Sequence, residues 1–386
     1  MTMRRRDLLK LLALGPLAGY ALPAAAQRRW ARALVLVELK GGNDGLNTLV
    51  PFTDPLYYKL RPRLALNPKS VLPLDKAWGL NGAMQALQPA WYAYEMAVVH
   101  GVGYAHPSRS HFRSSAVWET GADSDTWLDD GWLARQLAQA WPRNDYAADV
   151  IQLGPGDPGP LAGTDVRLLN LDEPSGFLRS ARPNPAPVKK VDNAALEHLL
   201  KTREELRNGA DPRALPPLIE APEGFPRTPF AQRLGQIARL MESESAAPIY
   251  KVTLDGFDTH RNQRVTHDRL LREFAEGLAA FRNALNANGL WSRTLVMTWS
   301  EFGRSVAENA QGGTDHGTAA PHFFLGGKVL GGLYGEPPSL ADLDGGELRH
   351  TADFRRLYAT AIEGWWGMKQ VYLPKGRFDP IPCLRE

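Results

Sequence analysis

The chain has 386 residues, with 45 Lys and Arg residues, 42 Asp and Glu residues and a single cysteine, Cys383. One cysteine excludes an intrachain disulfide and argues against a metal site or nucleophile built on cysteine. The first 26 residues carry four of the basic residues and one of the acidic residues, so the rest of the chain has 41 of each and is neutral. A neutral chain with no basic block gives no ground for nucleic-acid binding.

Residues 1–26 have the layout of an export signal, with a basic start, a short apolar stretch and small residues that end in Ala24-x-Ala26. That stretch is too short to cross a bilayer, and no later run is long enough, so we expect no transmembrane span in the mature chain. The segment RRDLLK, from Arg5 to Lys10, resembles the twin-arginine motif. The alternative is an ordinary secretory signal that contains three arginines. The resemblance implies export by the twin-arginine translocase in the folded state, and therefore a periplasmic or exported protein.

Short apolar runs rich in Leu and Val recur along the rest of the chain, and each ends at a polar or glycine-containing loop. They predict five buried strands, at residues 32–40, 95–103, 148–154, 249–256 and 293–300. Helical patterns lie between them, including residues 81–94 and 268–290, and a last helix is expected within 353–367. Strands that alternate with amphipathic helices predict an α/β three-layer sandwich with a mainly parallel central sheet.

We expect residues 27–386 to form a single domain. Residues 155–228 are rich in Pro and Gly and contain one polar helix-like segment, so they are interpreted as an insertion or lid on the sheet domain. In such sheets, sites form at the carboxyl ends of the strands. The residues that follow each predicted strand therefore matter most for function.

The loop after the first predicted strand reads KGGNDGLNTLVPF and places Asp44 at the mouth of that strand. Asp44 is a candidate metal ligand, and the alternative is a turn rich in Gly, Asn and Asp. The glycine spacing matches neither the dinucleotide-binding fingerprint nor the phosphate-binding loop of nucleotide hydrolases.

After the second predicted strand, Arg109, Ser110, His111 and Arg113 surround the expected start of a helix. A helix N-terminus favours negative charge, so these side chains suit an anionic group. The alternative is a helix capped by Ser110 and preceded by a solvated basic turn.

The loops after the fourth and fifth predicted strands contain Asp and His residues close together. Asp258 and His260 lie two residues apart, and the later loop contains Glu301, Asp315 and His316. Asp and His at such spacing are candidate ligands for a divalent metal, and the alternative is an Asp helix cap with surface histidines.

Histidines concentrate in these loops. Six of the nine lie in three post-strand loops, namely His106, His111, His260, His267, His316 and His322. Carboxylates and imidazoles that converge from several strand ends are what a divalent metal site needs, and mixed ligands of this kind suit Zn or Mn.

The order of the motifs ELKGGNDGLNTLVPF, HPSRSHFRSSAVWETG, GFDTH, SEFGR and GTDHG resembles a bacterial family numbered 1501 among domains of unknown function. More distantly, the chain resembles the alkaline-phosphatase-like superfamily of phosphatases, sulfatases and cofactor-independent phosphoglycerate mutases. This resemblance implies that one or two divalent ions are bound by acidic and histidine side chains at strand ends. The implied ligands are Asp44, Asp258, His260, Glu301 and His316, with Asp315 orienting the His316 ring or binding the metal.

The chain departs from the superfamily pattern in two places. The Asp-His pair expected directly after a strand is replaced by Glu301 and Phe302, which removes one ligand. The position of the nucleophile holds His111 with Ser110 beside it, so the nucleophile is Ser110, His111 or neither. Arg109 or Arg113 would clamp the oxygens of the anion.

The resemblance implies an exported metal-dependent hydrolase or transferase that acts on phosphate or sulfate esters, either a small anionic ester or a polymer of the cell envelope. The Cys/Ser-x-Pro-x-Arg signature of sulfatases is absent, which disfavours a sulfatase proper. The alternative is a non-catalytic binding or assembly protein of the cell envelope that keeps the fold.

Overall fold

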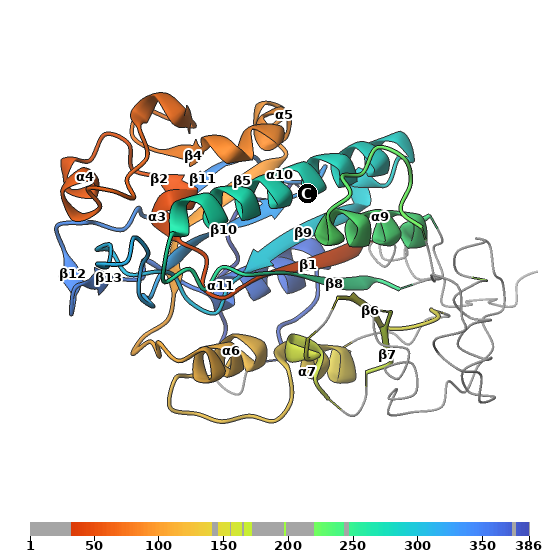
Figure 1. Cartoon of the computed structure of the whole chain (residues 1–386). Helices are drawn as coiled ribbons and strands as arrows, with labels where there is room; N and C mark the ends of the chain where they lie inside the picture. Colours follow the sequence, from red (N-terminus) through yellow and green to blue (C-terminus); the bar gives the residue numbers. More distant parts are fainter. Residues whose placement is uncertain are drawn as a thin grey trace, which may run out of the picture.

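The computed structural model describes residues 32–140, 146–154, 156–163, 166–171, 197, 220–242, 247–372 and 376–385 (Figure 1). The predicted export signal and most of the predicted insertion lie outside the described residues. No helix within the described ranges is long and apolar enough to cross a membrane.

A nine-stranded sheet forms the centre of the molecule, in the order β11-β5-β10-β9-β1-β8-β6-β7, with β14 also paired to β5. The strands are β1 (Ala33–Lys40), β5 (Met96–Gly103), β6 (Val150–Leu153), β7 (Leu168–Asn170), β8 (Ile249–Asp255), β9 (Thr294–Trp299), β10 (Ala320–Leu325), β11 (Gly332–Tyr334) and β14 (Ala352–Asp353). All pairs are parallel except those of β10. The five strands predicted from apolar runs are therefore all present.

Helices cover both faces of the sheet, which gives the three layers predicted from the sequence. Alternate residues of β1 divide between two apolar cores, with Val35 and Val37 in one and Leu34 and Leu36 in the other. The first core packs against η2 (Gly82–Leu87), α5 (Gln88–Tyr92), α9 (Pro229–Met241) and α10 (Gln263–Ala287). The second packs against α6 (His111–Thr120), α7 (Trp132–Ala140), α11 (Arg355–Ala359) and η7 (Thr360–Trp365). In Figure 1, α9 and α10 lie above the sheet and α6 and α7 lie below it.

Strand β10 differs from the prediction, in which its sequence APHFFL belongs to the loop that follows β9. It runs antiparallel between β5 and β9, and all six of its residues are buried. His322 belongs to this strand, so it lies in the core, away from the loops. Burial lowers its pKa to about 3, which keeps the imidazole neutral.

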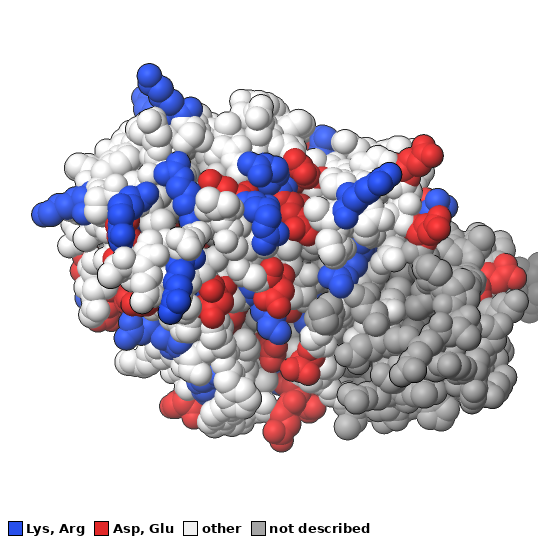
Figure 2. Space-filling view, in the orientation of Figure 1, with Lys and Arg blue, Asp and Glu red and all other residues white. Residues whose placement is uncertain are grey.

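Smaller elements surround the end of the sheet where the strands finish. They are α3 (Gly45–Thr48), α4 (Pro55–Leu60), the three-stranded sheet of β2 (Leu49–Val50), β4 (Gly79–Asn81) and β3 (Val71–Pro73), and the hairpin of β12 (Leu343–Asp344) and β13 (Glu347–Leu348). Short 3₁₀ turns occur at η1 (Pro68–Ser70), η3 (Gly159–Leu161) and η6 (Trp291–Arg293). Both kinds of charged side chain are distributed over the face shown in Figure 2, as the neutral composition of the chain without its first 26 residues leads us to expect.

The parallel strands β1, β8 and β9 are in register, so their carboxyl ends meet at one edge. Lys40 at the end of β1 pairs with Asp255 of β8, and Glu38 pairs with Trp299 of β9. The loops that follow these strands therefore approach one another, and the candidate site lies among them.

Candidate metal centre

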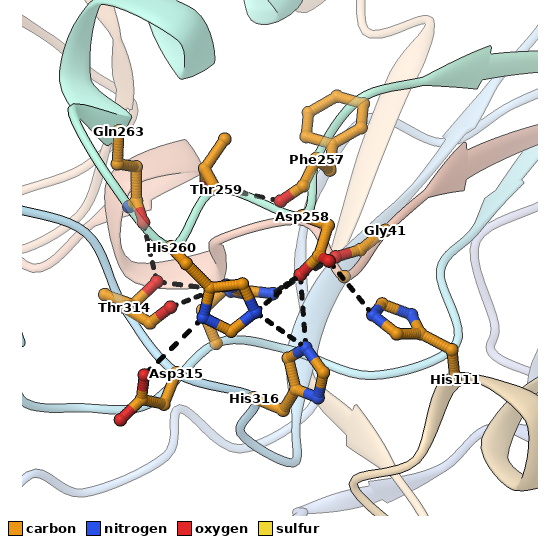
Figure 3. Close-up of polar contacts among 12 residues, drawn as sticks. Gly41, His111, Phe257, Asp258, Thr259, His260, Gln263, Thr314, Asp315 and His316 are labelled. Atoms are coloured by element: carbon orange, nitrogen blue, oxygen red, sulfur yellow. Dashed lines mark hydrogen bonds and ion pairs between the residues drawn. The ribbon is translucent and has the colours of Figure 1, made fainter.

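Asp258 lies at the centre of a polar cluster beyond the end of β8 (Figure 3). Its Oδ1 atom lies 2.8 Å from Nη1 of Arg304 and 2.9 Å from Nε2 of His260. Gly41, with φ +112°, lets the chain after β1 pass close to this loop, since a Cβ there would lie 2.4 Å from the Asp258 nitrogen. The first post-strand loop thus requires glycine in order to pack against the Asp258 loop.

His316 reaches the cluster from the loop between β9 and β10. Its Nε2 atom lies 3.1 Å from Oδ1 of Asp258 and 3.1 Å from Nε2 of His260. Its Nδ1 atom lies 2.7 Å from the backbone carbonyl of Arg109. A carbonyl only accepts hydrogen bonds, so Nδ1 carries the proton and, in the neutral ring, Nε2 carries a lone pair.

His111 is the first residue of α6 and approaches Asp258 from the other side. Its Nδ1 atom donates to Oε1 of Glu301 at 2.7 Å, and its Nε2 atom lies 3.4 Å from Oδ2 of Asp258. That Nε2 atom is buried and has no hydrogen-bond partner among the described residues. The Glu301 hydrogen bond raises the pKa of His111, although burial of the ring opposes this.

Each of the three imidazoles therefore directs Nε2 toward Asp258 and Nδ1 toward an acceptor. For His260 the acceptor is Oδ1 of Asp315, at the longer distance of 3.5 Å. If Nε2 of His260 carries a proton, that proton can be donated either to Asp258 or to Nε2 of His316, but not fully to both. In the other contacts a nitrogen lone pair faces a carboxylate oxygen or a second nitrogen lone pair, which is unfavourable. Further protons or a cation must therefore lie between the rings and the carboxylate.

The arrangement fits a divalent cation. Zn–N and Zn–O bonds of about 2.0–2.2 Å place tetrahedral ligand atoms roughly 3.3 Å apart. The distances among Oδ1 of Asp258 and Nε2 of His260 and His316 are 2.9, 3.1 and 3.1 Å, and the potential ligand atoms of His111, Asp258 and His316 all lie within 4.8 Å of one another. Metal-binding histidines usually donate their other N–H to a carboxylate or carbonyl, as His111 and His316 do here.

A buried guanidinium keeps Asp258 ionised. Burial by itself would raise the pKa of Asp258, but Arg304, through its hydrogen bond and its charge, is the main cause that lowers it to about 2. The Arg304 side chain is fully buried and also donates to the carbonyl of Thr314 at 2.5 Å and to that of Gly41 at 3.3 Å. The Asp258 carboxylate is thus available as an anionic ligand at any ordinary pH.

Residues 31–362 match the model of a family described as protein of unknown function, DUF1501. The chain belongs to this family. No curated protein matches it in sequence.

Solved structures with a related arrangement include the lipoteichoic acid synthase LtaP from Listeria monocytogenes, at 10% identity and a TM-score of 0.41, covering 88% of this chain and 73% of that one. A protein in the alkaline phosphatase superfamily from Vibrio parahaemolyticus is 9% identical, with a TM-score of 0.36, and covers 90% and 71%. The phosphonate monoester hydrolase of Agrobacterium radiobacter is 12% identical, with a TM-score of 0.36, and covers 76% and 68%. At these scores the likeness carries no argument about chemistry or substrate.

The structure places Asp44 apart from the cluster around Asp258. The Asp44 side chain is fully buried, and its two carboxylate oxygens accept from Nη1 of Arg61 at 2.9 and 2.7 Å and from Nε2 of Gln263. Burial would raise the pKa of Asp44, but the charge of Arg61 lowers it. A guanidinium therefore already neutralises the carboxylate that the resemblance implied as a ligand, and no sequence pattern indicated Arg61 as its partner.

Glu301 and Asp315 lie behind the histidines. Glu301 is buried, accepts from the backbone N–H groups of Gly41 and Gly42, and holds Nδ1 of His111. It thus orients a ring and does not itself face Asp258. Asp315 is exposed and adjoins His260, whereas the sequence led us to expect it beside His316.

The candidate catalytic residues other than His111 do not join the cluster through their side chains. Ser110 is exposed and caps α6 without a side-chain hydrogen bond. Arg113 donates to the carbonyls of Asp123, Ser124 and Thr126. Arg109 contributes its carbonyl to His316, while its exposed guanidinium lies 3.3 Å from Oε1 of Glu347.

Phe302 forms one wall of the cluster. Its ring centroid lies 4.8 Å from that of His111 and 4.6 Å from that of His316. The residue that replaces the superfamily histidine therefore packs against two of the candidate ligands. Of the six post-strand histidines, His111, His260 and His316 meet, whereas the structure places the other three elsewhere: His106 in the loop before α6, His267 in α10 bound to Asn43, and His322 in β10.

Proposed function

We propose that this protein is a metal-dependent hydrolase or transferase of phosphate or sulfate esters, with a divalent cation bound by His111, Asp258, His260 and His316. The observation that supports this most directly is the convergence of three Nε2 atoms on one ionised carboxylate. Two of the rings are fixed from behind, by Glu301 and by the Arg109 carbonyl. Fixed imidazole and carboxylate ligands suit Zn or Mn.

We infer that the site takes one cation. Two-metal sites hold their ions about 3.5–4 Å apart, so a second ion would need its own ligands beside the first set. Here the other carboxylate implied as a ligand, Asp44, is neutralised by Arg61, and Arg304 lies 2.8 Å from Oδ1 of Asp258. The two buried guanidiniums supply the positive charge that a second ion would bring.

When bound, such a cation would act as a Lewis acid on a phosphoryl or sulfuryl oxygen and would lower the pKa of a water molecule. The protein itself holds the ligands in place, and Phe302 shields one side of the cluster. The Ser110 hydroxyl makes no capping hydrogen bond, and no base among the described residues is bonded to it. We therefore propose direct attack by water or by an acceptor hydroxyl, without a covalent serine intermediate.

The test uses residues 27–386 purified without a histidine tag. Metal content is measured by mass spectrometry, and phosphate monoesters, phosphate diesters and sulfate esters are assayed. We expect about one equivalent of metal per chain, lost in His111→Ala and Asp258→Ala and retained in the control His350→Ala. No bound metal in the unaltered chain would refute the site, and bound metal without turnover would favour the non-catalytic envelope protein. Export through the twin-arginine route to the periplasm stays a prediction, which a fusion of residues 1–26 to a folded reporter would test.

A further inference from the structure

A pocket of about 480 Å³ adjoins the cluster, between residues 103–109 and the β12–β13 hairpin. Arg109 connects the pocket to the cluster, because it lines the pocket and its carbonyl accepts a hydrogen bond from His316. Thr318, two residues after His316, lines the pocket as well. The volume lies within the range of small-molecule sites. Two of the lining residues, Arg109 and Thr318, are two positions along the chain from the candidate ligands His111 and His316.

The lining of this pocket offers hydrogen-bond donors and acceptors in pairs. Arg109 lies 3.3 Å from Glu347, and Arg349 lies 3.4 Å from Asp344. His350 adds a ring that can donate or accept. Because the charges compensate each other, the pocket does not select a simple ion. Neighbouring donors and acceptors instead suit hydroxyl groups, which donate and accept at once.

Two exposed aromatic rings lie together beside the start of α6. Phe112 and Trp127 are 77% and 61% exposed, and their ring centroids lie 5.9 Å apart. Phe112 follows His111 directly in α6. Large aromatic side chains usually bury most of their surface, so a pair left exposed beside a polar cluster indicates a binding surface.

Arg113 holds Trp127, one member of the aromatic pair, in place. The guanidinium carbon of Arg113 lies 4.0 Å from the centroid of a Trp127 ring, a cation–π contact. Three backbone carbonyls of residues 123–126 fix the same guanidinium. Trp127 is thus ordered before any ligand arrives, which lowers the entropic cost of binding.

We propose that the ester group is carried by a carbohydrate, with hydroxyl groups of one sugar ring in the pocket and the C–H face of another ring on Phe112 and Trp127. A sugar ring offers both chemistries, a hydroxylated edge and an apolar face. His111 follows the pocket residue Arg109 by two positions and directly precedes Phe112, so the proposal places the ester group at the cluster and the rest of the saccharide on these two surfaces. This inference rests on the proposed function for the reacting group.

The experiment applies zinc-loaded residues 27–386 to an array of immobilised glycans that carry phosphate or sulfate groups. We expect specific retention that falls about tenfold in Trp127→Ala and in His350→Ala, because each removes one of the two contacts. The matched controls are Tyr92→Ala, an exposed aromatic residue on α5, and Arg377→Ala, an exposed arginine paired with Glu363; both are expected to bind like the unaltered chain.

Two outcomes would overturn the inference: no retention on any glycan, or equal retention by the unaltered chain, Trp127→Ala and His350→Ala. Retention of a protein partner through Trp127 with no glycan bound would overturn it as well. Hydrolysis of p-nitrophenyl phosphate and p-nitrophenyl sulfate separates this result from the proposed function. Turnover of the small esters without glycan binding refutes only the inference that the substrate is a carbohydrate. Glycan binding by a chain that retains no metal and hydrolyses neither ester refutes the proposed enzymatic function and leaves the carbohydrate site supported.

Discussion

Glu301 accepts a hydrogen bond from Nδ1 of His111 at 2.7 Å, across 190 residues of sequence. The carboxylate is itself fixed by the backbone N–H groups of Gly41 and Gly42. Three segments thus determine the orientation of one imidazole, so its Nε2 atom points at Asp258 without freedom to turn. A carboxylate behind a ligand also makes the imidazole more basic and a stronger ligand.

We expect Glu301→Gln to weaken zinc binding about tenfold to a hundredfold. The amide has a similar shape but loses the charge and half of the acceptor capacity that hold His111. Competition with a fluorescent chelator measures the affinity. The control is Glu308→Gln, a matched change at a carboxylate that binds Arg63 and the backbone N–H groups of Arg63 and Leu64 instead of a histidine. Unchanged affinity in Glu301→Gln would show that the His111 ring needs no such partner.

The Asp44–Arg61 pair predicts a loss of stability without a loss of metal. Both side chains are fully buried, so Arg61→Met leaves the Asp44 carboxylate with its charge uncompensated by Arg61. We expect the free energy of unfolding to fall by about 3–5 kcal/mol in urea titrations. The zinc content of the folded fraction should stay at one equivalent. A content of two in Arg61→Met would mean that the guanidinium had displaced a second ion.

Zinc binding should depend on pH through the histidines, because the pKa of Asp258 is already about 2. Below the pKa values of the imidazoles, protons compete with the metal for Nε2, and the raised pKa of His111 brings this competition to higher pH. We expect affinity to rise from pH 5 to pH 8 with release of protons. Calorimetry in buffers of different ionisation enthalpy measures that release, and an affinity independent of pH would exclude the imidazoles as ligands.

His322 should make the fold sensitive to acid. Burial lowers its pKa to about 3, below the unfolded value of 6.5, so the unfolded state binds a proton first as the pH falls. Stability should therefore decrease by about 1.4 kcal/mol per pH unit from pH 6.5 toward pH 3 on account of this residue. His322→Gln should reduce that slope in thermal melts between pH 7 and pH 4. An identical slope in both proteins would assign the acid sensitivity to other groups.

The strands and part of the site could be predicted from the sequence because both depend on local patterns. Apolar runs bounded by glycine and polar residues identified β1, β5, β6, β8 and β9. Post-strand position identified Asp258, His260 and His316, since parallel strands bring such loops together.

The other features of the fold and the site depend on contacts between distant segments, which no local sequence pattern predicts. Strand β10 follows a loop without a helix, so the alternation of strands and helices does not reveal it. Arg61 lies 17 residues after Asp44 in a segment that resembles any surface turn, yet its guanidinium is buried on that carboxylate. Whether Asp44 binds metal or arginine is therefore decided by packing, which a motif alone does not specify.

Strand β10 also determines how Arg304 and His316 are presented to Asp258. Because β10 runs antiparallel to β9, the chain between them is a hairpin, and Arg304 and His316 form a bridge across its two arms. Both reach the same oxygen of Asp258. The residues just beyond this bridge belong to the same network, because Thr314 accepts from Arg304 and Asp315 adjoins His260. A single insertion between 300 and 304, or between 316 and 320, would turn one arm over and remove either the arginine or the histidine from the carboxylate.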